Sequence, residues 1–301
     1  MLEWFSTFIT YLTYLLILKQ SIRFLYFLYR KLIRPRKDLI ERYGKDTWAL
    51  VTAGSDGIGK GISEELAATG FNILIAARTE EKMVVFCDLL KSKYSVKAEY
   101  IVVDFGKIEQ TFEEYQRIFG NYFHDREISI LVNNVGTLEF KSQLDLTIEE
   151  ASHTINLNCY PQTFLSKMFV DVRKEKGAII NLSSIAAEYV ILEQNMYGAT
   201  KKFNDYLSMG YALEYPKLDV ISVKPGGVES PLSQVKDDFF QATSAKNCAN
   251  GILNDLGYEM QTHGFWFHEV TSWILSLLPE FLLASVSQSQ LKAIAEKRKS
   301  K

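Results

Sequence analysis

The chain has 301 residues, of which 47% are hydrophobic and 23% are charged, and its formal net charge at pH 7 is -2. This length and apolar content suffice for one large buried core, and the near-neutral charge excludes a protein that binds nucleic acid through a general basic surface. The three cysteines have neither metal-ligand nor CxxC spacing, which favours ordinary buried thiols in a reducing compartment.

The N-terminal segment is strongly apolar. Between Trp4 and Tyr29 only Lys19, Gln20 and Arg23 are strongly polar, and a cluster of basic residues follows at positions 30–37. The charge-free part is shorter than the roughly 20 residues that span a bilayer, so a spanning anchor and an in-plane anchor are both open. A buried helix of a soluble domain is the alternative. We predict a membrane anchor over residues 1–33 and a basic linker over 34–47, with the rest of the chain in the cytosol.

From residue 48 onward, short apolar runs alternate with longer amphipathic stretches. The helical stretches include Gly59–Thr69 and Met196–Glu214. This alternation predicts an α/β fold with a doubly wound, Rossmann-like parallel sheet over residues 48–260, with ligands beyond the carboxyl ends of the strands. The predicted strands are Trp48–Thr52, Asn72–Ala76, Ala98–Val103, Ile128–Val132, Ala178–Leu182 and Val220–Val223.

A glycine-rich turn separates the first predicted strand from the first helix. Its sequence is Thr52-Ala53-Gly54-Ser55-Asp56-Gly57-Ile58-Gly59. Backbone N–H groups and the helix dipole at such a turn favour a pyrophosphate, although a tight turn without a ligand is the alternative. Arg78 follows the second strand, where an NAD site usually carries an acid. An arginine there suits a 2′-phosphate and predicts NADPH, unless Arg78 is simply a solvated surface residue.

Tyr197 and Lys201 are four residues apart in a helical stretch and therefore share one helix face. We expect the ammonium of Lys201 to lower the pKa of the phenol from its usual value of about 10. A carbonyl reduction needs such a proton donor beside the reacting oxygen. Ser184, at the end of a strand, can hydrogen-bond the carbonyl, and Ser183 is the alternative. Asn156 lies in mid-helix, where asparagine is disfavoured unless it has a local task such as binding a water.

Together these motifs resemble the short-chain dehydrogenase/reductase family over about residues 48–230. The resemblance implies that Tyr197 is the general acid, that Lys201 binds the nicotinamide ribose, and that Ser184 orients the carbonyl. It also implies that Asn156 holds a proton-relay water. The cofactor-binding residues that it implies are Thr52, Gly54, Ser55, Asp56, Gly57, Ile58, Gly59, Arg78, Asp104, Asn133, Tyr197, Lys201, Pro225, Val228 and Ser230.

One position departs from the family pattern. The family's first glycine directly follows the threonine, and here that position is Ala53, with Gly54 displaced by one. We expect the extra methyl group to crowd the turn and to weaken cofactor binding.

Further features resemble the membrane-bound branch of very-long-chain 3-oxoacyl-CoA reductases and 17β-hydroxysteroid dehydrogenases. They are the lead-in from Arg34-Pro35 to Tyr43-Gly44, the hydrophobic anchor and a second apolar stretch from Phe265 to Leu283. Residues 261–301 are expected to form an apolar, membrane-associated helical extension with a basic tail. Lys297 and Lys299 are similar to a cytosolic dilysine signal for retrieval to the endoplasmic reticulum (ER).

The resemblance to this branch implies NADPH-dependent reduction of 3-oxoacyl-CoA to 3-hydroxyacyl-CoA in fatty-acid elongation, at the ER membrane and facing the cytosol. The alternatives are a 17β-hydroxysteroid dehydrogenase or ketosteroid reductase, an NAD-dependent retinol or lipid dehydrogenase, and a non-catalytic cofactor-binding scaffold. Homodimers are frequent in the family, so a homodimer is possible. No metal and no nucleic acid is expected as a partner.

Overall fold

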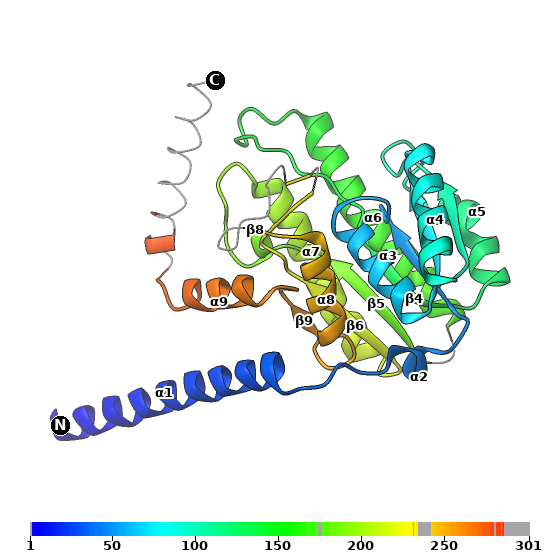
Figure 1. Cartoon of the computed structure of the whole chain (residues 1–301). Coiled ribbons are helices and arrows are strands. Elements are labelled where there is room, and N and C mark those ends of the chain that lie inside the picture. Colours follow the sequence, from blue (N-terminus) through cyan, green and yellow to red (C-terminus); the bar gives the residue numbers. More distant parts are fainter. Residues whose placement is uncertain are drawn as a thin grey trace. The chain divides into compact units, whose positions relative to one another are not determined.

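The computed structural model describes residues 2–173, 176–230, 232–233, 242–279, 281–283 and 285. A seven-stranded sheet in the order β3-β2-β1-β4-β5-β6-β9 forms its centre (Figure 1). All neighbouring strands in it are parallel, which confirms the predicted Rossmann-like sheet. Its strands are β1 (Trp48–Thr52), β2 (Asn72–Ala77), β3 (Ala98–Val102), β4 (Ile128–Asn133), β5 (Gly177–Leu182), β6 (Leu218–Val223) and β9 (Gln261–Thr262).

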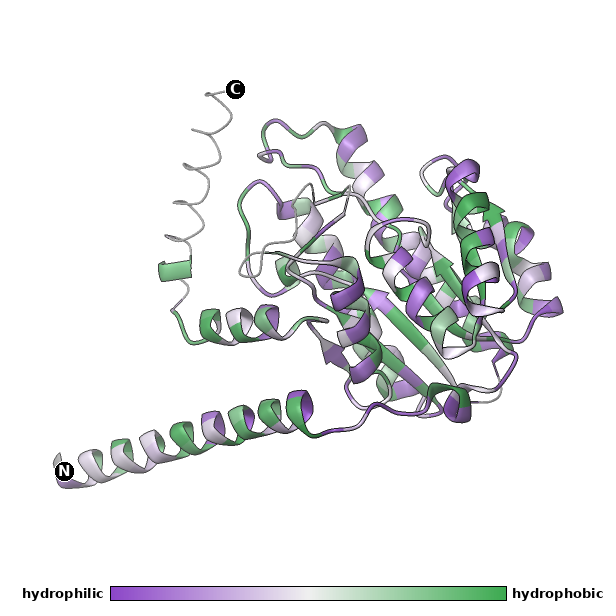
Figure 2. Ribbon diagram, viewed as in Figure 1, coloured by the Kyte–Doolittle hydropathy of each residue, from purple (hydrophilic) through white to green (hydrophobic). Residues whose placement is uncertain are grey.

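Helices cover both faces of the sheet, so its central strands are mostly apolar and are buried along their whole length without alternation (Figure 2). One core lies beneath α2, α3, α4 and α8, and a second beneath α5, α6 and α7. The helices on the first face are α2 (Leu39–Tyr43), α3 (Gly57–Thr69), α4 (Glu80–Tyr94) and α8 (Ala245–Asp255). Those on the second are α5 (Phe112–Asp125), α6 (Ile148–Val172) and α7 (Asn195–Glu214).

The compact unit that contains the sheet extends beyond residues 48–260 at both ends. Residues from Lys37 onward form one compact unit, although 34–47 was expected to be a linker. The buried helix α2 explains the difference, because Arg42 and the hydroxyl of Tyr43 both hydrogen-bond the carboxylate of Asp219. At the other end, β9 lies within the expected extension from residue 261 but pairs with β6.

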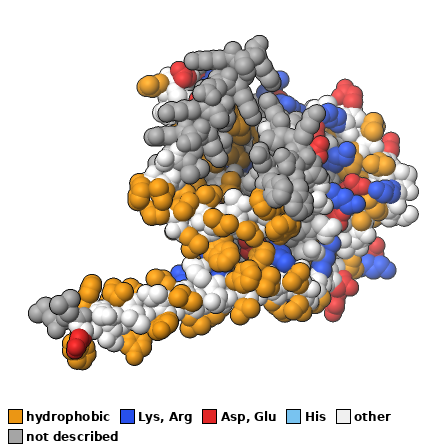
Figure 3. All heavy atoms as spheres, turned by 60° about the vertical axis from the view of Figure 1, so that its left-hand side comes forward, with side chains coloured by type: hydrophobic (Ala, Val, Ile, Leu, Met, Phe, Trp, Pro, Cys, Tyr) orange, Lys and Arg blue, Asp and Glu red, His pale blue; other side chains and the backbone are white. Residues whose placement is uncertain are grey.

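Residues 1–36 form a separate N-terminal unit. It contains α1 (Leu2–Leu32), whose surface carries hydrophobic side chains along its length (Figure 3). Among the described residues, no helix combines the length and the hydropathy needed to cross a membrane. At the other terminus, α9 (Trp266–Leu275) follows β9, and the predicted retrieval lysines Lys297 and Lys299 lie outside the described residues.

Candidate active site

The loop between β1 and α3 brings backbone close to the edge of the sheet. Helix α3 begins at Gly57, whose N–H is accepted by the carboxylate of the N-cap residue Asp56 at 2.9 Å. Gly57 has a φ of +49°, and a Cβ on Gly59 would lie 2.5 Å from Nδ2 of Asn134. Gly57 is therefore needed for its left-handed backbone conformation, and Gly59 is needed for close packing against Asn134. The positive end of the α3 dipole at this turn suits a pyrophosphate.

A pocket of about 460 Å³ opens at the carboxyl ends of β1, β2, β3 and β4. Arg78 is exposed there and makes no hydrogen bond or ion pair with any described residue. Beside it, Lys82 pairs with Asp56 at 2.8 Å. Seven of the predicted cofactor residues line the pocket, namely Ser55, Asp56, Gly57, Ile58, Arg78, Asp104 and Ser230. The other eight lie outside its lining, namely Thr52, Gly54, Gly59, Asn133, Tyr197, Lys201, Pro225 and Val228.

Two of those eight, Asn133 and Thr52, hold the loops in place instead. Asn133 is 3% exposed, and its Nδ2 donates to Ser166 Oγ at 3.0 Å and to Asn181 Oδ1 at 2.8 Å inside the core. The buried Thr52 Oγ1 accepts the N–H of Asn134 at 2.8 Å. Asn134, which belongs to the same Asn133–Gly136 segment but is not among the predicted cofactor-binding residues, lines the pocket in place of its neighbour. The alternation of side chains along β4 is the reason, because Asn133 still belongs to the strand and points into the core.

The structure brings three of the predicted catalytic residues together. Tyr197 and Lys201 lie on the buried face of α7, and Ser184 follows β5. The Lys201 Nζ atom is 5.6 Å from the centroid of the Tyr197 ring, and the Tyr197 hydroxyl hydrogen-bonds Ser184. A Cβ on the pocket residue Gly136 would lie 3.3 Å from Lys201 Nζ. The catalytic group is therefore adjacent to the nucleotide pocket.

Burial controls the titration of this pair. It raises the pKa of Tyr197 above its usual value, and the hydrogen bond with Ser184 opposes only part of that rise. Burial also lowers the pKa of Lys201 to about 8. The expectation that Lys201 would lower the pKa of the phenol is therefore wrong for this structure, because loss of water disfavours the charged form of both groups. At neutral pH Tyr197 stays protonated, which is the form that can give up a proton.

Asn158, two positions beyond the predicted Asn156, is the asparagine that reaches the catalytic group. It is 1% exposed, and its Oδ1 accepts the N–H of Thr137 at 2.7 Å while its Nδ2 donates to Thr200 Oγ1 at 2.9 Å. Asn156 is half-buried and lies outside the pocket lining. Positions two apart on a helix point to nearly opposite sides, so only one of them can face Lys201. The geometry favours Asn158 for the role assigned to Asn156.

The segment after β6 closes the site. The carbonyl of Pro225 accepts the N–H of Ile185 at 3.0 Å, which fixes this segment against the turn that follows Ser184. Val228 is 2% exposed and belongs to the core through the short strand β7 (Gly227–Val228). Its side chain is therefore not available to a ligand, although its backbone shapes the loop.

A strained residue lies within the phosphate loop. Ala53 has a φ of +49°, a left-handed conformation that costs a non-glycine residue about 1–2 kcal/mol. Glycine would avoid this strain but would cost about 0.5–1 kcal/mol in chain entropy. Ala53→Gly is therefore expected to raise the free energy of unfolding by up to about 1 kcal/mol in urea denaturation. It should also tighten NADPH binding, as measured by nicotinamide fluorescence.

Ala68→Gly is the matched control for this substitution. Ala68 is exposed on α3 in helical conformation, where glycine should destabilise by about 1 kcal/mol. Equal destabilisation by the two substitutions would show that the left-handed conformation at Ala53 is not strained.

The chain is similar to several known proteins. The family model described as short chain dehydrogenase matches residues 47–239. The chain is 32% identical to very-long-chain 3-oxoacyl-CoA reductase-B of Danio rerio, over 78% of this chain and 77% of that protein. It is 34% identical to hydroxysteroid dehydrogenase-like protein 1 of Gallus gallus, over 83% of this chain and 77% of that protein. The structure of a short-chain dehydrogenase from Sphingobium yanoikuyae in complex with NADPH superposes with a TM-score of 0.62 at 24% identity, covering 69% of this chain and 84% of that one.

Proposed function

The chain belongs to the short-chain dehydrogenase family of NAD(P)-dependent oxidoreductases, and on this premise we propose that it is an NADPH-dependent reductase of 3-oxoacyl-CoA. The observation that carries the enzymatic part is the buried group of Tyr197, Ser184 and Lys201 beside the nucleotide pocket. The substrate part rests on the relative from Danio rerio, whose name states that activity.

Each catalytic side chain has a separate task in this proposal. Bound in the pocket, NADPH would supply the hydride for the carbonyl carbon. Tyr197, held protonated by burial, donates its phenolic proton to the carbonyl oxygen as negative charge develops there. Ser184 hydrogen-bonds the same oxygen and so orients the substrate. Lys201 and Asn158 line the path by which the phenol regains a proton, because both lie against Gly136 at the edge of the pocket.

The assignment of NADPH rests on the residues around the adenosine end of the pocket. Arg78 has no partner among the described residues and directly follows β2, the position at which the family resemblance implies contact with a 2′-phosphate. Asp104 lines the same end and suits the adenine. The NADPH-bound structure from Sphingobium yanoikuyae supports the same choice through its likeness in fold.

A ketosteroid is the second candidate substrate, because the relative from Gallus gallus is named for hydroxysteroid dehydrogenases. The purified enzyme should oxidise NADPH in the presence of a long-chain 3-oxoacyl-CoA, followed by the loss of nicotinamide absorbance. The same assay with a 17-ketosteroid is the parallel arm. Turnover of the steroid alone would replace the proposed substrate, and turnover of neither compound would overturn both candidates.

We further propose that the enzyme is held at the ER membrane with the catalytic domain in the cytosol. Along α1, the side chains of Phe5, Phe8, Leu15 and Leu25 are more than half exposed, and basic residues follow the helix. The stretch from Phe265 to Leu283 should lie on the membrane surface near the substrate entrance.

The protein is therefore expected in the pellet after alkaline carbonate extraction of microsomes. A C-terminal tag should be digested by protease added to intact vesicles. Release by carbonate, or a tag protected from protease, would contradict this topology.

A homodimer through α7 is the proposed assembly. Phe203, Tyr206 and Leu213 are exposed on this helix, spaced by three and seven residues and therefore on one face. Tyr206→Glu is expected to convert a dimer to a monomer in analytical ultracentrifugation. A monomeric parent protein would exclude this interface.

A further inference from the structure

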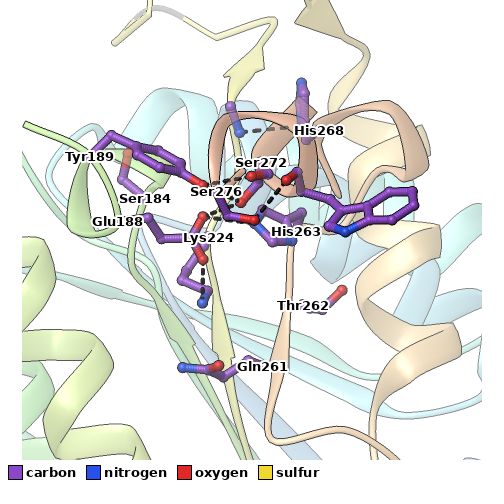
Figure 4. A network of polar contacts seen from close by, with 12 residues as sticks. Ser184, Glu188, Tyr189, Lys224, Gln261, Thr262, His263, His268, Ser272 and Ser276 are labelled. Carbon is purple, nitrogen blue, oxygen red and sulfur yellow. Dashed lines mark hydrogen bonds and ion pairs between the residues drawn. The ribbon is translucent and has the colours of Figure 1, made fainter. Parts of the chain in front are cut away.

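A buried polar network lies behind the catalytic serine (Figure 4). Its centre is Glu188, whose side chain is 18% exposed. One carboxylate oxygen pairs with Lys224 Nζ at 2.5 Å. The other contacts His263 Nε2 at 3.1 Å and accepts the hydroxyl of Ser272 at 2.5 Å. Burial alone would raise the pKa of Glu188, but the hydrogen bond and charge of His263, together with Lys224, hold that pKa at about 2. The carboxylate is therefore ionised at every pH at which the protein would be assayed.

The first segment that this network holds is the turn of the catalytic serine. Ser184 and Glu188 are the N-cap and the C-cap of one short 3-10 helix, Ile185–Ala187. The Ser184 hydroxyl accepts the N–H of Ala186 at 3.2 Å, and the N–H of Glu188 bonds the carbonyl of Ile185 at 2.9 Å. Because so short a turn transmits any displacement of one cap to the other, the position of Glu188 constrains that of Ser184.

The second segment is the loop that begins at Lys224. The N–H of Lys224 donates to the carbonyl of Thr262 at 2.7 Å, and Pro225 and Gly226 follow directly. The N–H of Gly226 in turn donates to Nδ1 of the buried His268 at 3.2 Å. Burial lowers the pKa of His268 to about 4. The ring is therefore neutral at neutral pH, and its Nδ1 atom can accept a hydrogen bond. The family resemblance implies that Pro225 and Gly226 flank the nicotinamide, so the segment beside that end of the cofactor is fixed on both sides.

The third segment is α9, which follows β9. Ser272 lies on this helix and donates to Glu188, while the hydroxyl of Tyr189 donates to the carbonyl of Ser272 at 2.6 Å. The same helix exposes Trp266 and Ile274, and it belongs to the apolar stretch that we assign to the substrate entrance.

We infer that Glu188 is a positioning residue, which joins the Ser184 turn, the Lys224–Gly226 loop and α9 into one unit and so aligns the carbonyl-orienting serine with the nicotinamide. The inference rests on the proposed function, and it goes beyond it by assigning a task to a residue that touches neither the substrate nor the cofactor. Three segments that are distant in the sequence meet at one carboxylate, and none of the three is fixed by the β-sheet alone.

The test compares NADPH with 2′-phospho-ADP-ribose, a fragment that lacks the nicotinamide. In Glu188→Gln the dissociation constant of NADPH should rise about tenfold, while that of the fragment stays unchanged, because only the nicotinamide end contacts the displaced loop. The turnover number should fall by up to about a hundredfold. Glu188→Asp, which keeps the charge, should recover part of both losses. If NADH binds more tightly than NADPH, then NADH and ADP-ribose form the corresponding pair.

Asp219→Asn is the matched control, because Asp219 is also a partly buried carboxylate with basic partners but lies at the opposite end of β6. It should lower the melting temperature without changing the ratio of the two dissociation constants. Ser272→Ala removes only the hydrogen bond between Glu188 and α9. If Glu188→Gln fails to fold, Ser272→Ala should shift the ratio in the direction expected for Glu188→Gln, by a smaller factor.

The inference would be overturned if Glu188→Gln weakened the binding of NADPH and of the fragment by the same factor. It would also be overturned if Asp219→Asn changed the ratio of the two dissociation constants as much as Glu188→Gln does. The binding ratio requires no carbonyl substrate. A wrong substrate assignment would therefore abolish turnover in the parent enzyme and leave this test intact.

Discussion

Replacement of Tyr197 by phenylalanine is expected to lower turnover by about 10²–10⁴-fold, the contribution that a positioned proton donor makes. The substitution removes one buried hydroxyl, whose hydrogen bond is with Ser184, and leaves the ring in place on α7. NADPH binding should remain near normal, because Tyr197 does not line the nucleotide pocket. Steady-state kinetics and a fluorescence titration with NADPH measure the two quantities separately.

Tyr211→Phe is the control for this substitution. Tyr211 lies on the same helix but packs against the second core, away from Ser184 and Lys201. It should keep the turnover of the parent enzyme. Comparable turnover in Tyr197→Phe and in the parent would remove Tyr197 from the mechanism, and loss of NADPH binding in Tyr197→Phe would show that the substitution acts through the fold.

The order of strands and helices could be predicted from the sequence because the strands are buried on both faces. Runs such as Ile128–Val132 are apolar apart from Ser129, and the structure extends that strand by one residue only. The carboxyl ends of these strands carry the polar motifs, so Arg78 and Asp104 were placed beside the glycine loop correctly. A parallel sheet gathers such ends at one edge whatever their separation in the chain.

The errors arise where neighbouring residues of one type compete for a position. Asn133 and Asn134 differ only in which of them still belongs to β4, and Asn156 and Asn158 only in which faces inward on α6. The helical period offered a signal for the second pair, because Thr154, Asn158 and Leu165 lie on one buried face. To choose between Asn133 and Asn134, the end of β4 must be known to within one residue, and sequence patterns do not give strand ends with that precision.

Other features depend on tertiary contacts that no local pattern contains. The helix α2 is buried because Arg42 and Tyr43 meet Asp219, which lies far along the chain. Glu188 meets Lys224 and His263 in the same way. The direction of the pKa shift of Tyr197 likewise depends on how fully the fold removes water from the phenol, which residue spacing cannot reveal.

The second large effect concerns the choice of cofactor. Arg78→Asp is expected to raise the dissociation constant of NADPH roughly ten- to a hundredfold, because a charge-assisted contact with the 2′-phosphate is worth about 1.5–3 kcal/mol. NADH lacks this phosphate, and an aspartate can accept a hydrogen bond from its ribose 2′-hydroxyl. The affinity for NADH should therefore stay the same or increase. Fluorescence titrations with both cofactors give the two constants.

Arg117→Asp separates this local contact from the general effect of charge. It changes the net charge by the same amount, and Arg117 lies exposed on α5, outside the nucleotide pocket, paired with Glu114. Its effect on NADPH should be small and should fade as salt is added, because surface charges are screened over about 10 Å at 0.1 M ionic strength. If Arg78→Asp weakens the binding of NADPH and NADH alike, or no more than Arg117→Asp does, then Arg78 does not bind the 2′-phosphate. A preference for NADPH must then come from another basic residue, and Lys82 in the pocket lining is the candidate.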